Sequence, residues 1–306
     1  NTHDSVLFFT SKGKVHQLKV FKLPKGSPQS KGRPMINVLP LSENETTTAL
    51  LEMPKEHDGY SLIFITSNGN VRRNAISDFS NIQSNGKIAM KLQEEDKLIS
   101  VLLCRSDNDI ILAAASGKCV RFSIQDVRVF SGRTSTGVRG IKLAEKDYLI
   151  SASVVNSIKC SSEEKEDYLK YSNAKKRDEI RDSLLSKERI IELSNQEQFL
   201  LTVTENGFGK RSSCYEYRTT KRGGQGIINI ETSNRNGGVI ASFPVEEDDQ
   251  IMLVTTKGKI IRSPVNDIRI AGRVTQGVNL LSIEKDEKVV SVTVIKKTIN
   301  DQEKEN

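Results

Sequence analysis

The sequence of 306 residues contains no tryptophan, and only 5 % of its residues are aromatic. WD40 propellers close their repeats with Trp-Asp pairs, and sialidase-type propellers depend on aromatic-rich repeats, so neither class fits. The four cysteines form no Cys-x-x-Cys pair, and only three histidines could assist them. The sequence therefore argues against a zinc site or a disulfide framework and favours a reducing cytosol.

Long apolar runs are also missing, and none approaches the length of a membrane span. The first residues, NTHDSVLFF, include neither an initiator methionine nor the basic-then-apolar pattern of a signal peptide. We expect the chain to be a fragment of a larger protein. No nucleophile–base–orienter set, metal-ligand spacing or carboxylate pair stands out, so the sequence predicts no catalytic site in this chain.

Positive charge is in modest excess, with 46 Lys and Arg against 39 Asp and Glu, a net charge of +7. This excess permits nucleic acid or another acidic partner without proving one. The positions of the cations are therefore more informative than their sum.

An internal repeat organises the chain. Five segments share an apolar strand, a polar turn ending in glycine, a second strand with cations, a loop, and another glycine before a β-branched strand. A last apolar strand closes each unit, so the pattern predicts four strands per unit. The glycine pairs, separated by 17 to 20 residues, are Gly13 and Gly32, Gly69 and Gly86, Gly117 and Gly137, Gly207 and Gly226, and Gly258 and Gly277.

Four-stranded units at this period are typical of propeller blades, whose radial packing protects the edges of the sheets. The sequence predicts an all-β, propeller-like single domain over residues 1–300, followed by a short acidic tail at residues 298–306. The predicted units span about residues 1–56, 57–106, 107–158, 198–247 and 248–297.

Residues 159–197 interrupt the repeat with a different composition. Ser161 and Glu164 have the spacing of a capping box, and Ile180 with Leu184 makes an apolar i,i+4 pair. We expect a small helical insertion of one or two helices. Its ten acidic and nine basic side chains nearly cancel, so it is interpreted either as a solvated decoration or as a helix that docks a partner.

Cations recur at equivalent places in the repeat. The fourth residue after the first glycine is Arg73, Arg121, Arg211 or Arg262, and only Gln17 differs. Blade packing gives no evident reason for an arginine there, so we predict a continuous track of phosphate contacts for duplex DNA, indifferent to sequence. The other predicted cationic contacts are Lys31, Arg33, Arg72, Lys118, Arg128, Arg133, Lys210, Arg218, Lys221, Arg222, Lys259, Arg269 and Arg273.

Two other interpretations of the repeated charge remain open. Surface strands carry Lys and Arg for solubility and edge protection, which would suit a protein-interaction propeller or, less well, an enzyme.

The stretch Thr219–Ile230, TTKRGGQGIINI, is equally ambiguous by itself. Its glycines and cations suit a phosphate, but a P-loop needs Gly-Lys-Ser/Thr before a helix, and this loop precedes a strand.

Several motifs in the same order resemble the C-terminal domain of the A subunit of bacterial DNA gyrase. They are NTHDSVLFFTSKGKV, KGRPMINVLPL, TSTGVRGIKL, ENGFGKR and AGRVTQGVNLL. The resemblance covers nearly the whole chain outside residues 159–197 and the tail, and some family members carry a similar insertion. It implies a β-pinwheel of about five to six four-stranded blades that exchange strands, with duplex DNA wrapped around a basic perimeter.

The resemblance also implies partners and a cellular setting. The chain would work with the rest of the gyrase A polypeptide and with gyrase B in an A2B2 holoenzyme of the bacterial cytoplasm, associated with the nucleoid. It would have no cofactor of its own, because the holoenzyme uses ATP and Mg elsewhere, and no membrane partner. The DNA-cleaving tyrosine of the family lies upstream, so this chain would wrap DNA and not cleave it.

The family's hallmark box reads Gln-Arg-Arg-Gly-Gly-Lys/Arg-Gly on its first blade. The segment from Thr220 to Gly226 resembles it, with Thr220 in place of the leading Gln and Gln225 in place of the last cation. We expect the box itself before Asn1, with the first blade either outside this chain or contributing only its final strand around residues 1–4. The segment is therefore predicted to be a secondary DNA-contact loop through Lys221, Arg222, Gly223, Gly224, Gln225 and Gly226. The corresponding domain of topoisomerase IV is the alternative within the family.

Overall fold

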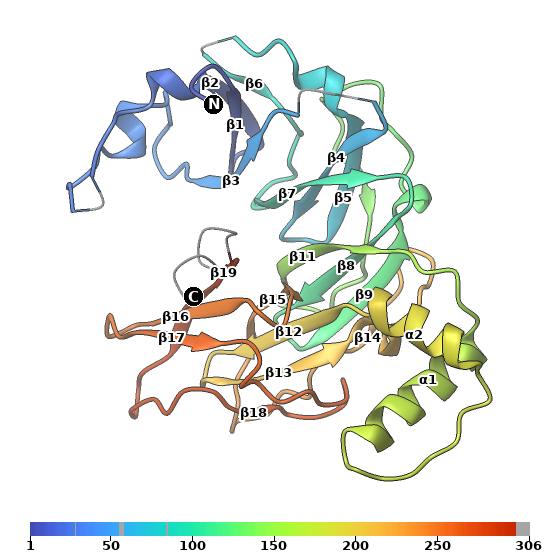
Figure 1. Ribbon diagram of the computed structural model, residues 1–306. Coiled ribbons are helices and arrows are strands. Elements are labelled where there is room, and N and C mark those ends of the chain that lie inside the picture. The colour runs from blue at the N-terminus through green and yellow to red at the C-terminus, as the bar shows by residue number, and fades with distance from the viewer. Residues whose placement is uncertain (28, 55–57, 84, 298–306) are drawn as a thin grey trace.

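The structure is a computed structural model that describes residues 1–27, 29–54, 58–83 and 85–297. The acidic tail predicted at residues 298–306 lies outside the described residues. Five antiparallel sheets follow one another around an open ring, which Figure 1 shows from one end. The fold is thus the predicted propeller of small sheets, with two added α-helices.

The first two sheets have four strands each. In order from the centre outward, sheet A consists of β3 (Thr47–Glu52), β1 (Ser5–Thr10), β2 (Lys14–Lys19) and β6 (Lys87–Ile88). Sheet B consists of β7 (Leu98–Arg105), β4 (Tyr60–Thr66), β5 (Asn70–Ala75) and β10 (Val138–Arg139).

The next two sheets repeat this order, and the fifth is shorter. Sheet C consists of β11 (Leu149–Asn156), β8 (Asn108–Ala114), β9 (Lys118–Ser123) and β14 (Ile227–Ile228). Sheet D consists of β15 (Val239–Val245), β12 (Phe199–Thr204), β13 (Phe208–Ser213) and β18 (Val278–Asn279). Within the described residues, sheet E has three strands, β19 (Val289–Ile295), β16 (Gln250–Thr255) and β17 (Ile260–Pro264).

The outermost strand of each four-stranded sheet comes from the following repeat unit. For example, β14 follows Gly226 of the fourth unit and pairs with β9 of the third, where Ile227 faces Cys119. Gly226 makes this approach possible, because it has a φ of +77° and a Cβ there would lie 2.4 Å from the Cys119 carbonyl oxygen. Strand exchange therefore links each sheet to the next.

Short 3₁₀ helices follow the strands that accept an exchanged strand. They are η1 (Val20–Lys22), η3 (Ile76–Phe79), η4 (Ile124–Asp126) and η5 (Cys214–Glu216). The strand predicted after Gly32 was wrong for this unit, because the residues form a fifth 3₁₀ helix, η2 (Met35–Asn37). Its counterparts in the other units are strands because they pair with a preceding sheet, and η2 is paired with none of the described strands.

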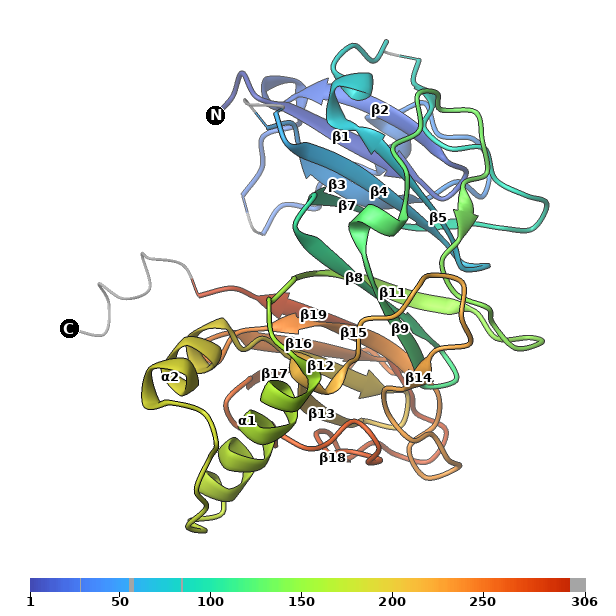
Figure 2. The same cartoon turned by 90° about the vertical axis from the view of Figure 1, so that its right-hand side faces the viewer.

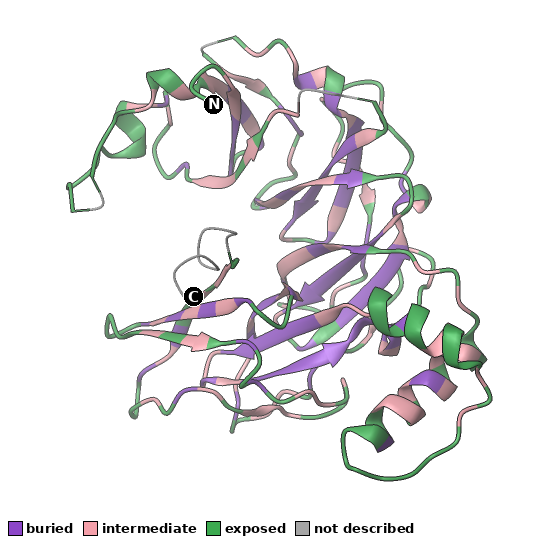
Figure 3. Ribbon diagram, viewed as in Figure 1, coloured by how far each residue is buried: buried purple, intermediate pink, exposed green. Residues whose placement is uncertain are grey.

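Apolar clusters between consecutive sheets form the core, which Figure 3 shows as purple strands around the ring. Phe9 of sheet A packs with Phe64 of sheet B, and Leu112 lies in the cluster between sheets B and C. The cluster between sheets D and E includes Leu201 and Leu253. Burial on both faces explains why the leading strand of each unit is a continuous apolar run.

The insertion forms two helices, α1 (Ser162–Lys175) and α2 (Lys187–Gln196), which lie outside the ring in Figures 1 and 2. The predicted capping box of Ser161 and Glu164 is confirmed. The apolar pair predicted within a helix was wrong, because Ile180 and Leu184 lie between the two helices and are fully exposed. Spacing alone could not reveal that no apolar surface faces them.

Candidate nucleic-acid interface

The repeated arginine behind the first glycine is buried at the contact between consecutive units. Arg121 is 3 % exposed and forms an ion pair with Asp109, with 2.8 Å between Nε and Oδ2. It also donates to the carbonyl oxygen of Cys214 in η5 at 2.8 Å. Arg211 donates in the same way to the Ile268 carbonyl oxygen at 2.7 Å. Arg73 donates to the Ile124 carbonyl oxygen at 3.4 Å.

These contacts correct the prediction that Arg73, Arg121 and Arg211 form a surface track for DNA. Each guanidinium ties the turn of the following unit to its own sheet, so blade packing gives these three arginines a structural role. Gln17 serves unit one by accepting a hydrogen bond from the Ile82 amide at 3.3 Å. In sheet E, Arg262 is exposed, and among the described residues its side chain bonds only to Gln250 of its own sheet.

Arg72 and Lys210, one residue earlier in their units, are also buried. Arg72 donates to the Arg133 carbonyl oxygen at 2.5 Å, and Lys210 donates to the Gly272 carbonyl oxygen at 2.6 Å. Burial lowers the pKa of Arg72 to about 10 and that of Lys210 to about 7. Both side chains hold the loop before an exchanged strand, and the prediction of a DNA contact by either is corrected.

A second arginine series lies on the surface. Arg128, Arg218 and Arg269 each directly precede the residue that bridges to the buried arginine of the previous unit, in the pairs Arg73–Val129, Arg121–Thr219 and Arg211–Ile270. All three side chains are exposed. The guanidinium of Arg128 lies 4.5 Å from the Phe130 ring centroid, which holds it against the surface. Three consecutive units thus present an arginine at one equivalent place on the outer loops.

A third series lies four residues before the second glycine and is half-buried. Arg222 donates to the carbonyl oxygens of Asp126 and Arg139, and Arg273 donates to that of Ile228. Arg133 donates to the Asp78 carbonyl oxygen at 3.4 Å. These side chains fasten each outer loop to the previous unit, and part of each guanidinium region remains at the surface.

The box-like loop is anchored at one end and open at the other. The Gly223 amide donates to the Gly140 carbonyl oxygen at 2.6 Å, whereas a Cβ at Gly224 would meet no atom within 4 Å. Lys221 is exposed and pairs with Asp126 at 2.9 Å. The loop, including Gln225, lines a cavity of about 210 Å³ together with Arg218. The geometry makes it a structural loop that also presents cations.

The remaining predicted contacts are exposed and scattered over the ring. They are Lys31, Arg33, Lys118 and Lys259. Lys259 lies 3.7 Å from Glu287, so part of its charge is compensated. Arg139, on the exchanged strand β10, is exposed at the rim and was missed by the sequence reasoning. Its place, two residues after the second glycine, was the available signal.

The comparisons with known proteins agree on one family. A family model described as "DNA gyrase C-terminal domain, beta-propeller" matches residues 4–51, 60–105, 108–156, 198–246 and 249–296. The A subunit of DNA gyrase from Rickettsia bellii (strain RML369-C) is 46 % identical over 318 residues, which cover 100 % of this chain and 35 % of that protein. Its counterpart from Salmonella typhimurium (strain LT2) is 36 % identical, covering 99 % of this chain and 30 % of that protein. The chain spans about a third of the length of these curated relatives.

Solved structures support the fold. The "Structure of DNA gyrase A C-terminal domain" superposes with a TM-score of 0.70 at 24 % identity, covering 96 % of this chain and 83 % of that one. The "Crystal structure of the C-terminal domain of DNA topoisomerase IV" gives a TM-score of 0.76 at 21 % identity, covering 96 % of this chain and 80 % of that one. Within the described part of the chain, neither helix is long and apolar enough to cross a membrane.

Proposed function

Because this chain belongs to the family of DNA gyrase C-terminal domains, we propose that it binds duplex DNA around the rim of its β-propeller and wraps it without sequence specificity. The wrapped segment would present DNA to the strand-passing part of a gyrase and so favour negative supercoiling. One observation carries the proposal: Arg128, Arg218 and Arg269 occupy equivalent exposed positions on three consecutive outer loops.

Regular spacing of cations matches the regular charge of a phosphate backbone. Nearby exposed side chains extend the proposed contact surface, which we call the rim cations: Lys31, Arg33, Lys118, Arg128, Arg139, Arg218, Lys221, Lys259, Arg262 and Arg269. The half-buried Arg133, Arg222 and Arg273 would support them from the loops. The glycine-rich loop from Lys221 to Gly226 would let a phosphate approach the backbone closely.

The outer surface favours backbone contacts over base readout. The exchanged strands at the rim are two residues long, and the two α-helices belong to the insertion, so the described repeats offer only short 3₁₀ helices and no α-helix for a major groove. Aromatic residues are few, which disfavours stacking on single strands. Duplexes of different sequence should therefore bind alike within about tenfold.

Gyrase is favoured over topoisomerase IV by sequence. The relatives from Rickettsia bellii and Salmonella typhimurium, at 46 and 36 % identity, are named as the A subunit of DNA gyrase, whereas the likeness to the topoisomerase IV domain is one of fold at 21 % identity. The TM-scores of 0.70 and 0.76 do not separate the two.

The wider role follows from the same relatives. We place the chain in the gyrase A polypeptide of a bacterium, with gyrase B as partner in an A2B2 enzyme of the cytoplasm and nucleoid. DNA cleavage, ATP hydrolysis and Mg binding would belong to parts outside this chain, and the chain would act as the wrapping module.

Ligation of a nicked circle in the presence of the chain tests wrapping directly. A shift in linking number that disappears at high salt is the expected result, because wrapping traps writhe and depends on phosphate contacts. Binding without a shift would refute wrapping by these five sheets. No salt-sensitive binding would refute the DNA interface and favour a protein-interaction propeller.

A further inference from the structure

We propose that the helical insertion extends the DNA-binding rim, with Lys176 and Arg177 at the end of α1 gripping a backbone phosphate beside Arg269. This inference rests on the proposed function and adds a contact site that the repeats do not supply. The insertion as a whole is nearly neutral, but its cations are unevenly placed. The end of α1 brings two of them against Arg269, the last member of the exposed series Arg128, Arg218 and Arg269.

The site is a cavity of about 570 Å³ between α1 and the outer loop of the fifth unit. Its lining includes Lys176 and Arg177 from the insertion and Arg269 from the loop, and no acidic side chain. Lys176, Arg177 and Arg269 are exposed. Within the described chain, neither the Arg177 nor the Arg269 guanidinium has a carboxylate partner, so both are available to an anion.

The cavity also contains the buried Arg211, whose charge is partly compensated by Glu247 at 3.9 Å. Arg211 also donates to the Ile268 carbonyl oxygen. Lys210 lies beneath the loop and donates to the Gly272 carbonyl oxygen and to Thr275 Oγ1. These bonds fix the loop that carries Arg269, so the cation is presented by a supported backbone. The site suits a phosphate oxygen with three surrounding donors.

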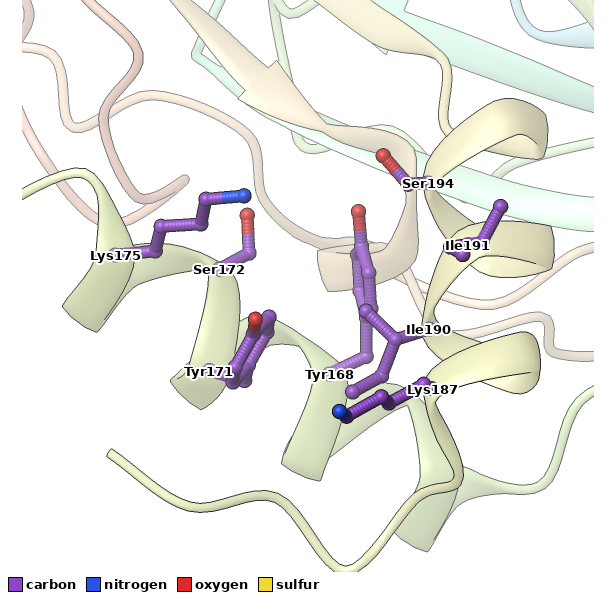
Figure 4. Close-up of a pocket in the computed structure, with 8 residues that line it drawn as sticks. All are labelled: Tyr168, Tyr171, Ser172, Lys175, Lys187, Ile190, Ile191 and Ser194. Carbon is purple, nitrogen blue, oxygen red and sulfur yellow. The ribbon is translucent and has the colours of Figure 1, made fainter. Parts of the chain in front are cut away.

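The insertion is fixed to the propeller firmly enough to position these side chains. The rings of Tyr168 and Tyr215 meet edge to face, with 5.4 Å between their centroids, and Tyr215 Oη donates to the Leu193 carbonyl oxygen at 2.8 Å. Figure 4 shows Tyr168 between α1 and α2. Lys176 Nζ lies 5.4 Å from the Phe199 ring centroid of β12, which holds the end of α1 against sheet D.

Duplex DNA is the occupant that this geometry favours. Arg128, Arg218 and Arg269 follow the units around the rim, and the insertion cations lie directly beside the last of them. A duplex that follows the series thus passes the end of α1. An acidic protein segment would have no reason to align with the periodic series.

The test compares K176Q/R177Q with the wild-type chain on a linear random-sequence duplex of roughly 150 bp, about one persistence length. We expect the slope of log affinity against log salt to become less negative by about 1.8, because each lost phosphate contact contributes roughly 0.9. Affinity near 0.1 M salt should fall roughly three- to tenfold. K176R/R177K should retain the wild-type slope, since both cations remain.

The matched control is K159Q/K187Q, which removes two exposed cations of the same insertion that do not line the cavity. An equal slope for K176Q/R177Q and K159Q/K187Q, with both chains folded by thermal unfolding, would overturn the inference. R128Q/R218Q separates this failure from that of the proposed function. If that variant flattens the slope while K176Q/R177Q does not, the rim binds DNA and the insertion takes no part.

Discussion

The contacts between consecutive sheets, which we call seams, and the outer rim both carry repeated arginines, but the first series is structural and the second is exposed to solvent. Arg73, Arg121 and Arg211 are 3 to 8 % exposed and hold the turn of the next unit through backbone carbonyls. Arg128, Arg218 and Arg269 are exposed one residue before the bridges to those arginines. A repeated cation therefore identifies DNA contacts only when its burial is known.

The largest expected effect breaks the seam at Arg121. In R121M the buried Asp109 loses its ion-pair partner, so we expect the free energy of unfolding to fall by about 3–5 kcal/mol. Denaturant unfolding measures the change. R121M/D109L should recover much of the loss because no buried charge is left alone. A loss below about 1 kcal/mol in R121M would contradict a structural role for the series.

Within three residues, the box-like loop has one glycine packed against the neighbouring strand, Gly226, and one facing open space, Gly224. In G226A, the new Cβ would meet the Cys119 carbonyl oxygen at 2.4 Å and the backbone would keep a φ of +77°, so we expect a loss of about 2–3 kcal/mol. G224A is the matched control, because its Cβ would face open space. Equal thermal midpoints for the two variants would show that the exchanged strand does not depend on this approach.

Lys210 makes the stability of the seam depend on pH. Its pKa is about 7 when folded against an ordinary value of 10.5, so between these values the unfolded chain binds more protons and stability rises with pH. We expect a gain of about 1 kcal/mol from pH 7 to about 8, still below the pKa of about 8.5 at which unfolded thiols titrate. K210M should lose this gain and K118M, at an exposed lysine, should keep it. An unchanged pH dependence in K210M would exclude Lys210 as its source.

The smallest expected effect concerns Arg262, the member of the first series with no following unit among the described residues. Since Arg262 is exposed and its side chain bonds only to Gln250 among the described residues, R262Q should change the free energy of unfolding by less than about 0.5 kcal/mol. R211Q should be several times more costly, because two backbone carbonyls lose their donor. Similar losses of unfolding free energy in R262Q and R211Q would mean that contact with the next unit does not determine whether an arginine of this series is structural.

The sequence predicts the fold to the extent that local patterns decide it. The paired glycines and apolar runs indicate five units of short strands, and Ser161 with Glu164 indicates the start of α1. The partner of each exchanged strand is set by long-range contacts, so neither local segment predicts that Ile227 pairs with Cys119. For the same reason the segment after Gly32 was predicted as a strand, although it forms η2.

The candidate interface is less predictable than the fold because burial decides it. Arg211 and Arg218 look alike in sequence, yet one lies under the loop of the next unit and the other on the surface. The fourth residue after the first glycine is a buried arginine in three units. The exposed arginines are found only from the structure, as the residues directly before the bridge partners of the buried ones. The site formed by Lys176, Arg177 and Arg269 joins residues from separate units, which a repeat period cannot bring together.

The most direct measurement is the salt dependence of duplex binding for R128Q/R218Q/R269Q beside the wild-type chain. The account predicts that the slope of log affinity against log salt becomes less negative by about 2.7, with unfolding free energy changed by less than about 1 kcal/mol. An unchanged slope in the folded variant would contradict the assignment of the exposed arginine series to DNA.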